Sequence, residues 1–303
     1  MLPQESNFTD IRRDCQRHWR VVGGVRHTPR AMKKLRIDLP EKLRVRGAVR
    51  FTLREAAAGD THGWEESRAR AESERLAGKL EDLQYRLHAD GRYGVLVVLQ
   101  AIDGGGKDST IRHVFSAFNP QGCTVHAFKT PSTEELSHDY LWRVHAHTPP
   151  RGEIAVFNRS HYEDVLIARV NHLVPRPVWE ARYRQINDFE RLLAECNTHV
   201  VKIFLHISKA EQRRRFEARI HEPRKQWKFD TQDLVKRKQW QAYRLAFGEM
   251  LGRCNTRRAP WYVVPANHKW LRDLAVSQIM YAALRSLALR FPAPRFNPRV
   301  RVT

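Results

Sequence analysis

The chain has 303 residues, of which 42% are hydrophobic and 29% are charged. This composition supplies enough apolar side chains for a real core and excludes a collagen-like, wholly disordered or mini-protein chain. No stretch approaches the roughly 18 apolar residues of a membrane-spanning helix, and the start, MLPQESNFTDIRRDCQRHWR, has no apolar run of signal-peptide length. We therefore expect a cytoplasmic protein that does not enter a membrane.

The charge balance is extreme, because 54 Lys and Arg residues stand against 33 Asp and Glu residues, a formal net charge of +21. Arginine dominates, with 41 residues against 13 lysines. A guanidinium grips phosphate with two hydrogen bonds, so this bias suits a polyanionic partner. Codon choice in a GC-rich genome also explains a high arginine share, but it does not explain the net charge. We expect nucleic acid, a nucleotide or another phosphate polymer as partner.

The predicted elements alternate between helices and buried strands after a basic, irregular N-terminal arm over residues 1–62. Leucines at helical spacing predict a helix over 64–88. Short apolar runs predict five strands: Val95–Leu99, Thr124–Phe128, Ile154–Phe157, His199–Leu205 and Trp261–Val264. Helices are predicted near 108 and over 133–147, 160–172, 177–196 and 268–290. This alternation predicts an α/β domain over 63–303, with a parallel five-stranded sheet flanked by helices.

A long charged helical stretch, about 209–252, separates the fourth and fifth strands. Residues 209–244 contain twelve Lys and Arg against five Asp and Glu, a net charge of +7. The length exceeds that of an ordinary crossover, so we expect a helical hairpin that stands off the core. Its positive excess, Pro223 and Trp227 favour a lid over an anionic ligand. A solvated helix face is the alternative interpretation.

The sequence AIDGGGKDS, residues 101–109, joins the first strand to a helix. Glycines let backbone N–H groups surround a phosphate, and the helix start adds its positive end. Lys107 is then placed to reach the more distal phosphoryl groups. The match to the Walker A pattern is imperfect, because Ala101 replaces the first glycine and Asp108 replaces the Ser or Thr; Asp103 is an unusual extra carboxylate. We predict a phosphate-binding loop, with a plain glycine-rich turn as the alternative.

A second motif, FNRSHYED, closes the third predicted strand at residues 157–164. In phosphate-loop enzymes this position supplies a carboxylate to the Mg²⁺ shell, but here Asn158 takes that place. Glu163 and Asp164, one turn into the next helix, can supply the missing charge. Arg159 lies at the strand end, where a guanidinium can meet a phosphate. The alternative for the two carboxylates is a favourable interaction with the helix N-terminus, about 0.3–1 kcal/mol each.

From Val95 to about Met280, the chain resembles the family-2 polyphosphate kinases, which are polyphosphate:nucleotide phosphotransferases. The resemblance rests on the order and spacing of AIDGGGKDSTI, FKTPSTEELSHDYLWR, GEIAVFNRSHYEDVL, FLHISKAEQRRRF, RIHEPRKQWKF and APWYVVP. FNRSHYEDVL is similar to the class III subgroup, which accepts nucleoside mono- and diphosphates. The resemblance implies a thymidylate-kinase-like P-loop fold, a helical lid, Mg²⁺ dependence with Mn²⁺ as a substitute, and a homo-oligomer, either a dimer or a tetramer.

The function that we expect is reversible, Mg²⁺-dependent transfer of the terminal phosphoryl group from inorganic polyphosphate to AMP or ADP, which regenerates ATP from ADP. The protein mostly positions the reactants and neutralises charge in such a transfer. Asp103, Lys107 and Arg159 are the predicted catalytic residues, and Asp103, Asn158 and Glu163 are the predicted metal ligands. Predicted phosphate-binding residues are Gly104, Gly105, Gly106, Asp108, Ser109, Arg169, Arg219, Arg224, Lys225 and Lys228. For Trp142, Trp227 and Tyr162 we favour packing over stacking on a base.

Two other functions share some of these features. An ATP-dependent nucleoside or nucleotide kinase has the same fold and lid, but a single ATP requires less positive charge than this chain carries. A basic nucleic-acid-binding NTPase is the third candidate. We do not expect nucleic acid to bind, because the sequence contains no helix-turn-helix, RRM or zinc-finger signature.

Overall fold

The computed structural model describes residues 38–47 and 50–296. Most of the predicted arm, residues 1–37, lies outside this range. Within the range, residues 39–58 do not stand apart from the domain that we predicted to begin at 63. Leu39, Leu53 and Ala58 are buried in the same compact unit as the sheet, and the backbone N–H of Val45 donates to the carbonyl oxygen of Trp261 at 2.8 Å.

The sheet has five parallel strands in the order β2-β3-β1-β4-β5. Their bounds are β1 Gly94–Ala101, β2 Cys123–Ala127, β3 Ile154–Asn158, β4 Thr198–His206 and β5 Trp261–Pro265, so all five predicted strands are confirmed. The central β1 is buried at every residue, as its continuous apolar run predicts. Leu99 of β1 pairs with Asn158 of β3, and this register places the carboxyl ends of the two strands together.

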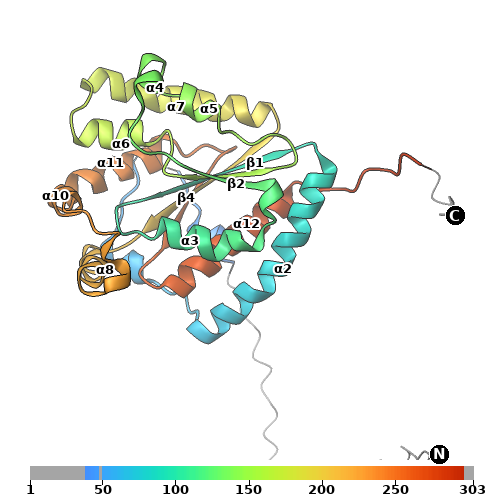
Figure 1. The fold of residues 1–303 in the computed structure, drawn as a ribbon, viewed down its shortest axis with the longest axis horizontal. Coiled ribbons are helices and arrows are strands. Elements are labelled where there is room, and N and C mark those ends of the chain that lie inside the picture. Colours follow the sequence, from blue (N-terminus) through green and yellow to red (C-terminus); the bar gives the residue numbers. More distant parts are fainter. Residues whose placement is uncertain (1–37, 48–49, 297–303) are drawn as a thin grey trace, which may run out of the picture. The chain divides into compact units, whose positions relative to one another are not determined.

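Helices cover both faces of the sheet (Figure 1). One face carries α2 (Glu66–Asp90), α3 (Lys107–Val114) and α12 (Lys269–Ser286), and the other carries α6 (Glu163–Val170), α7 (Arg176–Glu195) and α11 (Trp240–Arg253). The remaining α-helices are α1 (Leu39–Leu43), α4 (Thr133–Ser137), α5 (Trp142–His145), α8 (Lys209–His221), α9 (Pro223–Gln226) and α10 (Gln232–Lys238). No helix in the described part of the chain is both long and apolar enough to span a membrane.

The stretch 133–147, predicted as one helix, forms α4 and α5 instead. Ser132 caps the start of α4 in a reciprocal pair with Glu135. The side chain of Asp139 then accepts a hydrogen bond from the backbone N–H of Leu141 at 2.9 Å. Such a local side-chain contact offers the backbone an alternative to helix and interrupts it.

The stretch 209–252, predicted as one hairpin off the core, divides into α8, α9, α10 and α11. The prediction is wrong for α11, whose side chains enter the core on the α6 face. Tyr243, Phe247 and Leu251 recur at steps of four residues and are buried, so one side of α11 is an apolar stripe. The highly charged residues 209–238 precede this stripe, and only they fit the expected composition of a lid.

Candidate active site

The glycine-rich loop lies between the carboxyl end of β1 and the start of α3 (Figure 1). Gly104 and Gly106 adopt left-handed backbone conformations, with φ of 82° and 99°. A Cβ atom at Gly106 would also collide with the guanidinium of Arg272. Glycine is therefore required here both by the backbone angle and by the close approach of a cation. The predicted turn into a helix N-terminus is present, and such a terminus directs backbone N–H groups towards an anion.

Lys107 directly follows this loop, and its side chain is part-buried. Its Nζ donates to the carbonyl oxygen of Ala101 at 3.2 Å. Burial lowers the pKa of Lys107, and the negative charge of Asp103 opposes that shift. For Asp103, burial opposes ionisation, but Lys107, Arg159 and Lys236 together hold its pKa below the ordinary value. The loop thus concentrates preorganised charges in a site with little water, where they act strongly.

Arg159 reaches the same carboxylate from the end of β3. Its Nη2 donates to Asp103 Oδ1 at 3.1 Å, and Nζ of Lys236 in α10 donates to Asp103 Oδ2 at 3.2 Å. Arg159 has a positive φ of 64°, a conformation that non-glycine residues hold only where the surrounding structure enforces it. The structure therefore brings Asp103, Lys107 and Arg159, the predicted catalytic residues, into one site and adds Lys236, which we had not predicted.

Asn158 and Glu163 flank Arg159 at the same edge of the sheet. Asn158 Nδ2 donates to Asp108 Oδ1 at 2.6 Å, which ties β3 to the start of α3. Burial raises the pKa of Glu163, although Arg159 and Lys107 oppose the shift, and Gln100 donates a hydrogen bond to its carboxylate. The Asp103 carboxylate adds to the raised pKa of Glu163, so the two acidic groups are close enough to repel each other.

This pair of carboxylates fits a divalent cation. No group of three or more His, Cys, Asp or Glu side chains with metal-binding spacing occurs among the described residues. Mg²⁺ does not need one, since it binds through one or two carboxylates, water and substrate phosphates. A buried carboxylate whose pKa is raised by burial and by a second carboxylate is a group that gains from a cation. Asp103 and Glu163, which line the same pocket, supply such donors, and Asn158, the third predicted ligand, contacts Asp108 instead.

Further cations lie around the glycine loop that sequence reasoning missed. Arg215 Nη1 donates to the carbonyl oxygen of Gly104 at 2.8 Å, and Arg272 Nη1 donates to Ser109 Oγ at 2.9 Å. Burial lowers the pKa of Lys269, and the positive charges of Arg215, Lys225 and Arg272 lower it further. Arg215 is paired with Glu211 and Arg272 with Asp273, so part of this positive charge is compensated, and the remaining excess favours an anionic ligand such as phosphate.

Comparison with known proteins decides the family. Residues 63–291 match the family described as Polyphosphate kinase 2. The chain belongs to the polyphosphate kinase 2 family. It is 48% identical over 257 residues to the AMP/ADP-polyphosphate phosphotransferase of Meiothermus ruber, a match that covers 84% of this chain and 96% of the relative.

Two other comparisons agree with this assignment. The ADP-polyphosphate phosphotransferase of Rhodopseudomonas palustris is 46% identical over 71% of this chain and 78% of the relative. Among solved structures, Polyphosphate Kinase 2 from Arthrobacter aurescens TC1 superposes with a TM-score of 0.83 at 40% identity, covering 86% of this chain and 93% of that one. The predicted P-loop kinase fold is confirmed.

In this polyphosphate kinase 2 the four predicted lid cations lie in or beside α8 and α9. Arg219 Nη1 donates to Asp233 Oδ2 at 3.1 Å, Lys225 pairs with Glu222, and Lys228 lies 4.9 Å from the ring centre of Trp227. Trp227 is 78% exposed. This segment thus presents cations and an aromatic ring to solvent, but the described structure shows no contact from Arg224, Lys225 or Lys228 to the glycine loop, and its role as a lid stays a prediction.

Arg169 is placed differently from the other predicted phosphate-binding residues. Its guanidinium donates two hydrogen bonds to Glu249, at 2.8 and 3.1 Å, and lies 4.5 Å from the ring centre of Trp179. Asp103, Arg159 and Glu163 line the pocket beside the loop, whereas Arg169 lines neighbouring hollows with Arg176 and Trp179. Its predicted place on a phosphate track stays a prediction.

The three aromatic side chains considered for base stacking differ in how far they are exposed to solvent. Tyr162 is completely buried in the core, as we favoured. The favoured packing in the core is wrong for Trp227, which is 78% exposed, and for Trp142, which is 41% exposed and stacks on His138 at a centroid distance of 4.2 Å. The aromatic residues that line the pocket beside the loop are instead Trp240, Tyr243 and Phe247 of α11. We did not predict them, because we expected this segment to stand off the core.

Proposed function

We propose that this protein transfers the terminal phosphoryl group of inorganic polyphosphate to a nucleoside mono- or diphosphate of the AMP or ADP type, reversibly. One observation carries the proposal: a glycine loop with part-buried Lys107 meets Asp103 and Arg159, with further cations around it, in a member of this family. The activities named for the relatives from Meiothermus ruber and Rhodopseudomonas palustris support it.

The residues of the site have separate roles in the transfer. An oxygen of the acceptor phosphate attacks the terminal phosphorus of polyphosphate, and the bond to the bridging oxygen breaks, leaving its electron pair on the shortened chain. Lys107 and the loop N–H groups hold the phosphoryl group as it moves. Arg159, at the opposite side of Asp103, neutralises charge that spreads over the phosphoryl oxygens. Arg215 and Arg272 hold the loop in shape through Gly104 and Ser109.

Mg²⁺ is part of the proposal, with Mn²⁺ as a substitute. Asp103 and Glu163 would hold the ion, with the Asn158 side-chain oxygen as a third donor. When bound, the ion supplies charge neutralisation between neighbouring phosphates. Assembly into a dimer or tetramer and a cytoplasmic location are also proposed, the first from the resemblance and the second from the sequence.

The proposal is tested by the phosphate donor. With short-chain polyphosphate as sole donor, the purified protein should convert ADP to ATP and AMP to ADP, both measured by chromatography of the nucleotides. ATP with a nucleoside, the reaction of an ordinary nucleoside kinase, is the parallel assay. Activity with ATP alone, and none with polyphosphate under any Mg²⁺ concentration, would refute the proposal.

A second prediction concerns the lid. Replacing Arg224, Lys225 and Lys228 together by alanine should raise the KM for polyphosphate and flatten its salt dependence, with little change for the nucleotide. For a single-stranded phosphate polymer, each cation that neutralises one phosphate adds about 0.7 to the slope of log affinity against log salt. Because the variant removes three cations, the slope should fall by about 2. We would measure both KM values between about 50 and 300 mM salt, where screening lengths fall from about 14 Å to about 6 Å.

A matched variant separates the lid from a general loss of charge. Arg86, Arg184 and Arg191 are exposed on α2 and α7, each paired with a nearby aspartate. Replacing these three by alanine removes the same formal charge and should leave the slope for polyphosphate within error of the wild type. If the lid variant also leaves that slope unchanged, Arg224, Lys225 and Lys228 belong to a solvated surface and do not bind the donor.

A further inference from the structure

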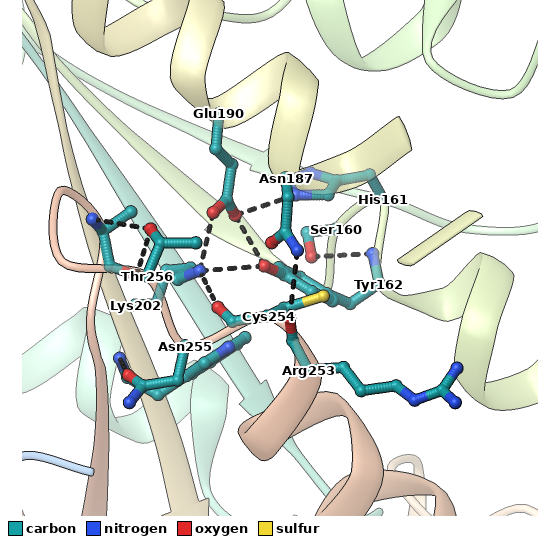
Figure 2. Close-up of polar contacts among 12 residues, drawn as sticks. Ser160, His161, Tyr162, Asn187, Glu190, Lys202, Arg253, Cys254, Asn255 and Thr256 are labelled. Carbon is teal, nitrogen blue, oxygen red and sulfur yellow. Dashed lines mark hydrogen bonds and ion pairs between the residues drawn. The ribbon is translucent and has the colours of Figure 1, made fainter. Parts of the chain in front are cut away.

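A network of buried polar side chains lies beneath the turn that carries Arg159 and Glu163 (Figure 2). Glu190 of α7, Lys202 of β4 and Tyr162 meet there, and none of their side chains is more than 1% exposed. Lys202 Nζ donates to Glu190 Oε2 at 2.6 Å, to the Cys254 carbonyl oxygen at 2.6 Å and to Tyr162 Oη at 3.0 Å. All three donors of the ammonium group are therefore used.

Both carboxylate oxygens of Glu190 also have hydrogen-bond partners. Glu190 Oε1 accepts a hydrogen bond from Tyr162 Oη at 2.6 Å, and His161 Nε2 lies 3.4 Å from the same oxygen. Burial opposes ionisation of Glu190, but Lys202 and His161 hold its pKa below the ordinary value. Two full charges are thus kept in the core of the α6 and α7 face, each with every partner supplied from the chain.

Stability alone does not account for such a pair. Removing two charges from water is expensive, and well-packed apolar residues of similar volume often give equal or greater stability. A buried network does, however, fix geometry, because its hydrogen bonds are directional and breaking any one leaves a charge unsatisfied. The relevant question is which geometry depends on Glu190 and Lys202.

The turn above the network alternates between the two sides. Arg159 and Glu163 point towards Asp103 and the glycine loop, whereas His161 and Tyr162 between them point down to Glu190. Ser160 Oγ, in the same turn, accepts hydrogen bonds from Gln100 Nε2 at 3.1 Å and from the backbone N–H of Tyr162 at 3.2 Å. The turn is therefore held at its middle residues, while its two ends enter the site.

The conformation of Arg159 shows why the turn needs holding. Its φ of 64° is unfavourable for a residue with a side chain and persists only where neighbours enforce it. Its backbone N–H donates to the Leu99 carbonyl oxygen at 3.1 Å, which fixes one side of the residue. The other side continues into Ser160, His161 and Tyr162, which the buried network fixes.

We propose that Glu190 and Lys202 are positioning residues for phosphoryl transfer, which hold the 159–163 turn so that Arg159 and Glu163 face the reacting phosphate. This inference rests on the function proposed above. It assigns no contact with substrate to either residue. Misplacement of catalytic groups by about 1 Å costs on the order of 10²-fold in rate, so a loosened turn affects kcat more than substrate binding.

The test separates geometry from stability with a double variant. Glu190→Leu/Lys202→Met removes both charges and keeps the volume, whereas Lys202→Met alone leaves a buried, unpaired carboxylate. We expect the single variant to melt well below the wild type and the double variant to recover most of that loss. The kcat of the double variant should nevertheless stay about tenfold or more below that of the wild type, with KM for the nucleotide within about twofold.

Tyr162→Phe provides a second, milder variant in case the double variant fails to fold. It leaves the pair of Glu190 and Lys202 in place and removes the hydroxyl that joins the turn to both, so that His161 is the remaining contact of the turn with Glu190. The expected result is a loss of kcat, with a fall in melting temperature smaller than that of Lys202→Met. Leu80→Ala in α2, where Leu80 is 1% exposed and distant from the turn, supplies a destabilised control that should keep the wild-type kcat when assayed well below its melting temperature.

Each outcome decides one of the two proposals. If the double variant or Tyr162→Phe retains the wild-type kcat, the network has a purely structural role and the inference is wrong. If the wild type shows no transfer from polyphosphate, the proposed function fails instead, and the same variants are compared with whichever donor the wild type accepts.

Discussion

Replacing Lys107 by alanine is expected to lower kcat for phosphoryl transfer by about 10²–10³, the loss typical of one preorganised charge contact. The charge of Lys107 interacts with those of Asp103, Arg159 and Glu163, and its Nζ donates to the carbonyl oxygen of Ala101 at the end of β1. Burial lowers the pKa of Lys107, so the charged form of this side chain does not stabilise the fold. Removing it should therefore leave the melting temperature within about 5 °C of the wild type.

The measurement is kcat under saturating polyphosphate and nucleotide, together with a thermal melt of the same sample. Lys79→Ala is the matched control, because Lys79 is an exposed lysine on α2 whose Nζ lies over Tyr281 at 5.6 Å. This control should keep the wild-type kcat. A Lys107→Ala protein that retains more than about a third of kcat would exclude Lys107 from the reaction centre, since one preorganised contact accounts for a much larger loss.

The sheet could be predicted from the sequence because its strands are short apolar runs separated by helical patterns. Strand β1 is buried on both faces and therefore apolar throughout, and the glycine loop follows it directly in the chain. The placement of Lys107 and Asp103 follows from local sequence for the same reason. Arg159 was predictable as well, because parallel strands bring their carboxyl ends to one edge.

The rest of the site could not be predicted because it depends on contacts between distant segments. Arg272 is completely buried beside the glycine loop, yet in the sequence it is one arginine among 41. Lys236 reaches Asp103 across 133 residues of chain. A charge run shows that cations are present over 209–244, but it does not show which of them turns inward. Only the packing of α11 on α6 decides that, and it places Lys236 at the loop.

The buried pair of Glu190 and Lys202 illustrates the same limit in the core. Lys202 interrupts the apolar run of β4, and Glu190 falls on the apolar side of α7. Each is an exception to the pattern that predicted its element. Exceptions of this kind concentrate where a protein holds a specific geometry, so a charged residue within a buried strand is a usable signal once its partner is sought on the adjacent helix.

Asp103→Asn is expected to lower Mg²⁺-dependent activity by about 10²-fold or more, and Asp108→Asn to have a clearly smaller effect. Asp103 lies inside the loop, and its carboxylate is shared between Arg159 and Lys236 at 3.1 and 3.2 Å. An amide is isosteric with this carboxylate but carries no charge, so the cations around it repel each other and a metal ion loses a donor. Asp108, at the first turn of α3, instead accepts a hydrogen bond from Asn158 at 2.6 Å.

The measurement is a titration of rate against Mg²⁺ for both variants. For Asp103→Asn we expect a higher Mg²⁺ requirement as well as a lower plateau, because excess ion cannot restore the lost carboxylate. For Asp108→Asn the plateau should stay near the wild-type value, since an asparagine can still accept a hydrogen bond from Asn158 through its side-chain oxygen. A larger loss for Asp108→Asn would mean that the helix carboxylate, in the place of the Walker A Ser or Thr, is the metal ligand. The contacts of Arg159 and Lys236 with Asp103 would then have a purely structural role, and the metal site would lie between Asp108 and Asn158.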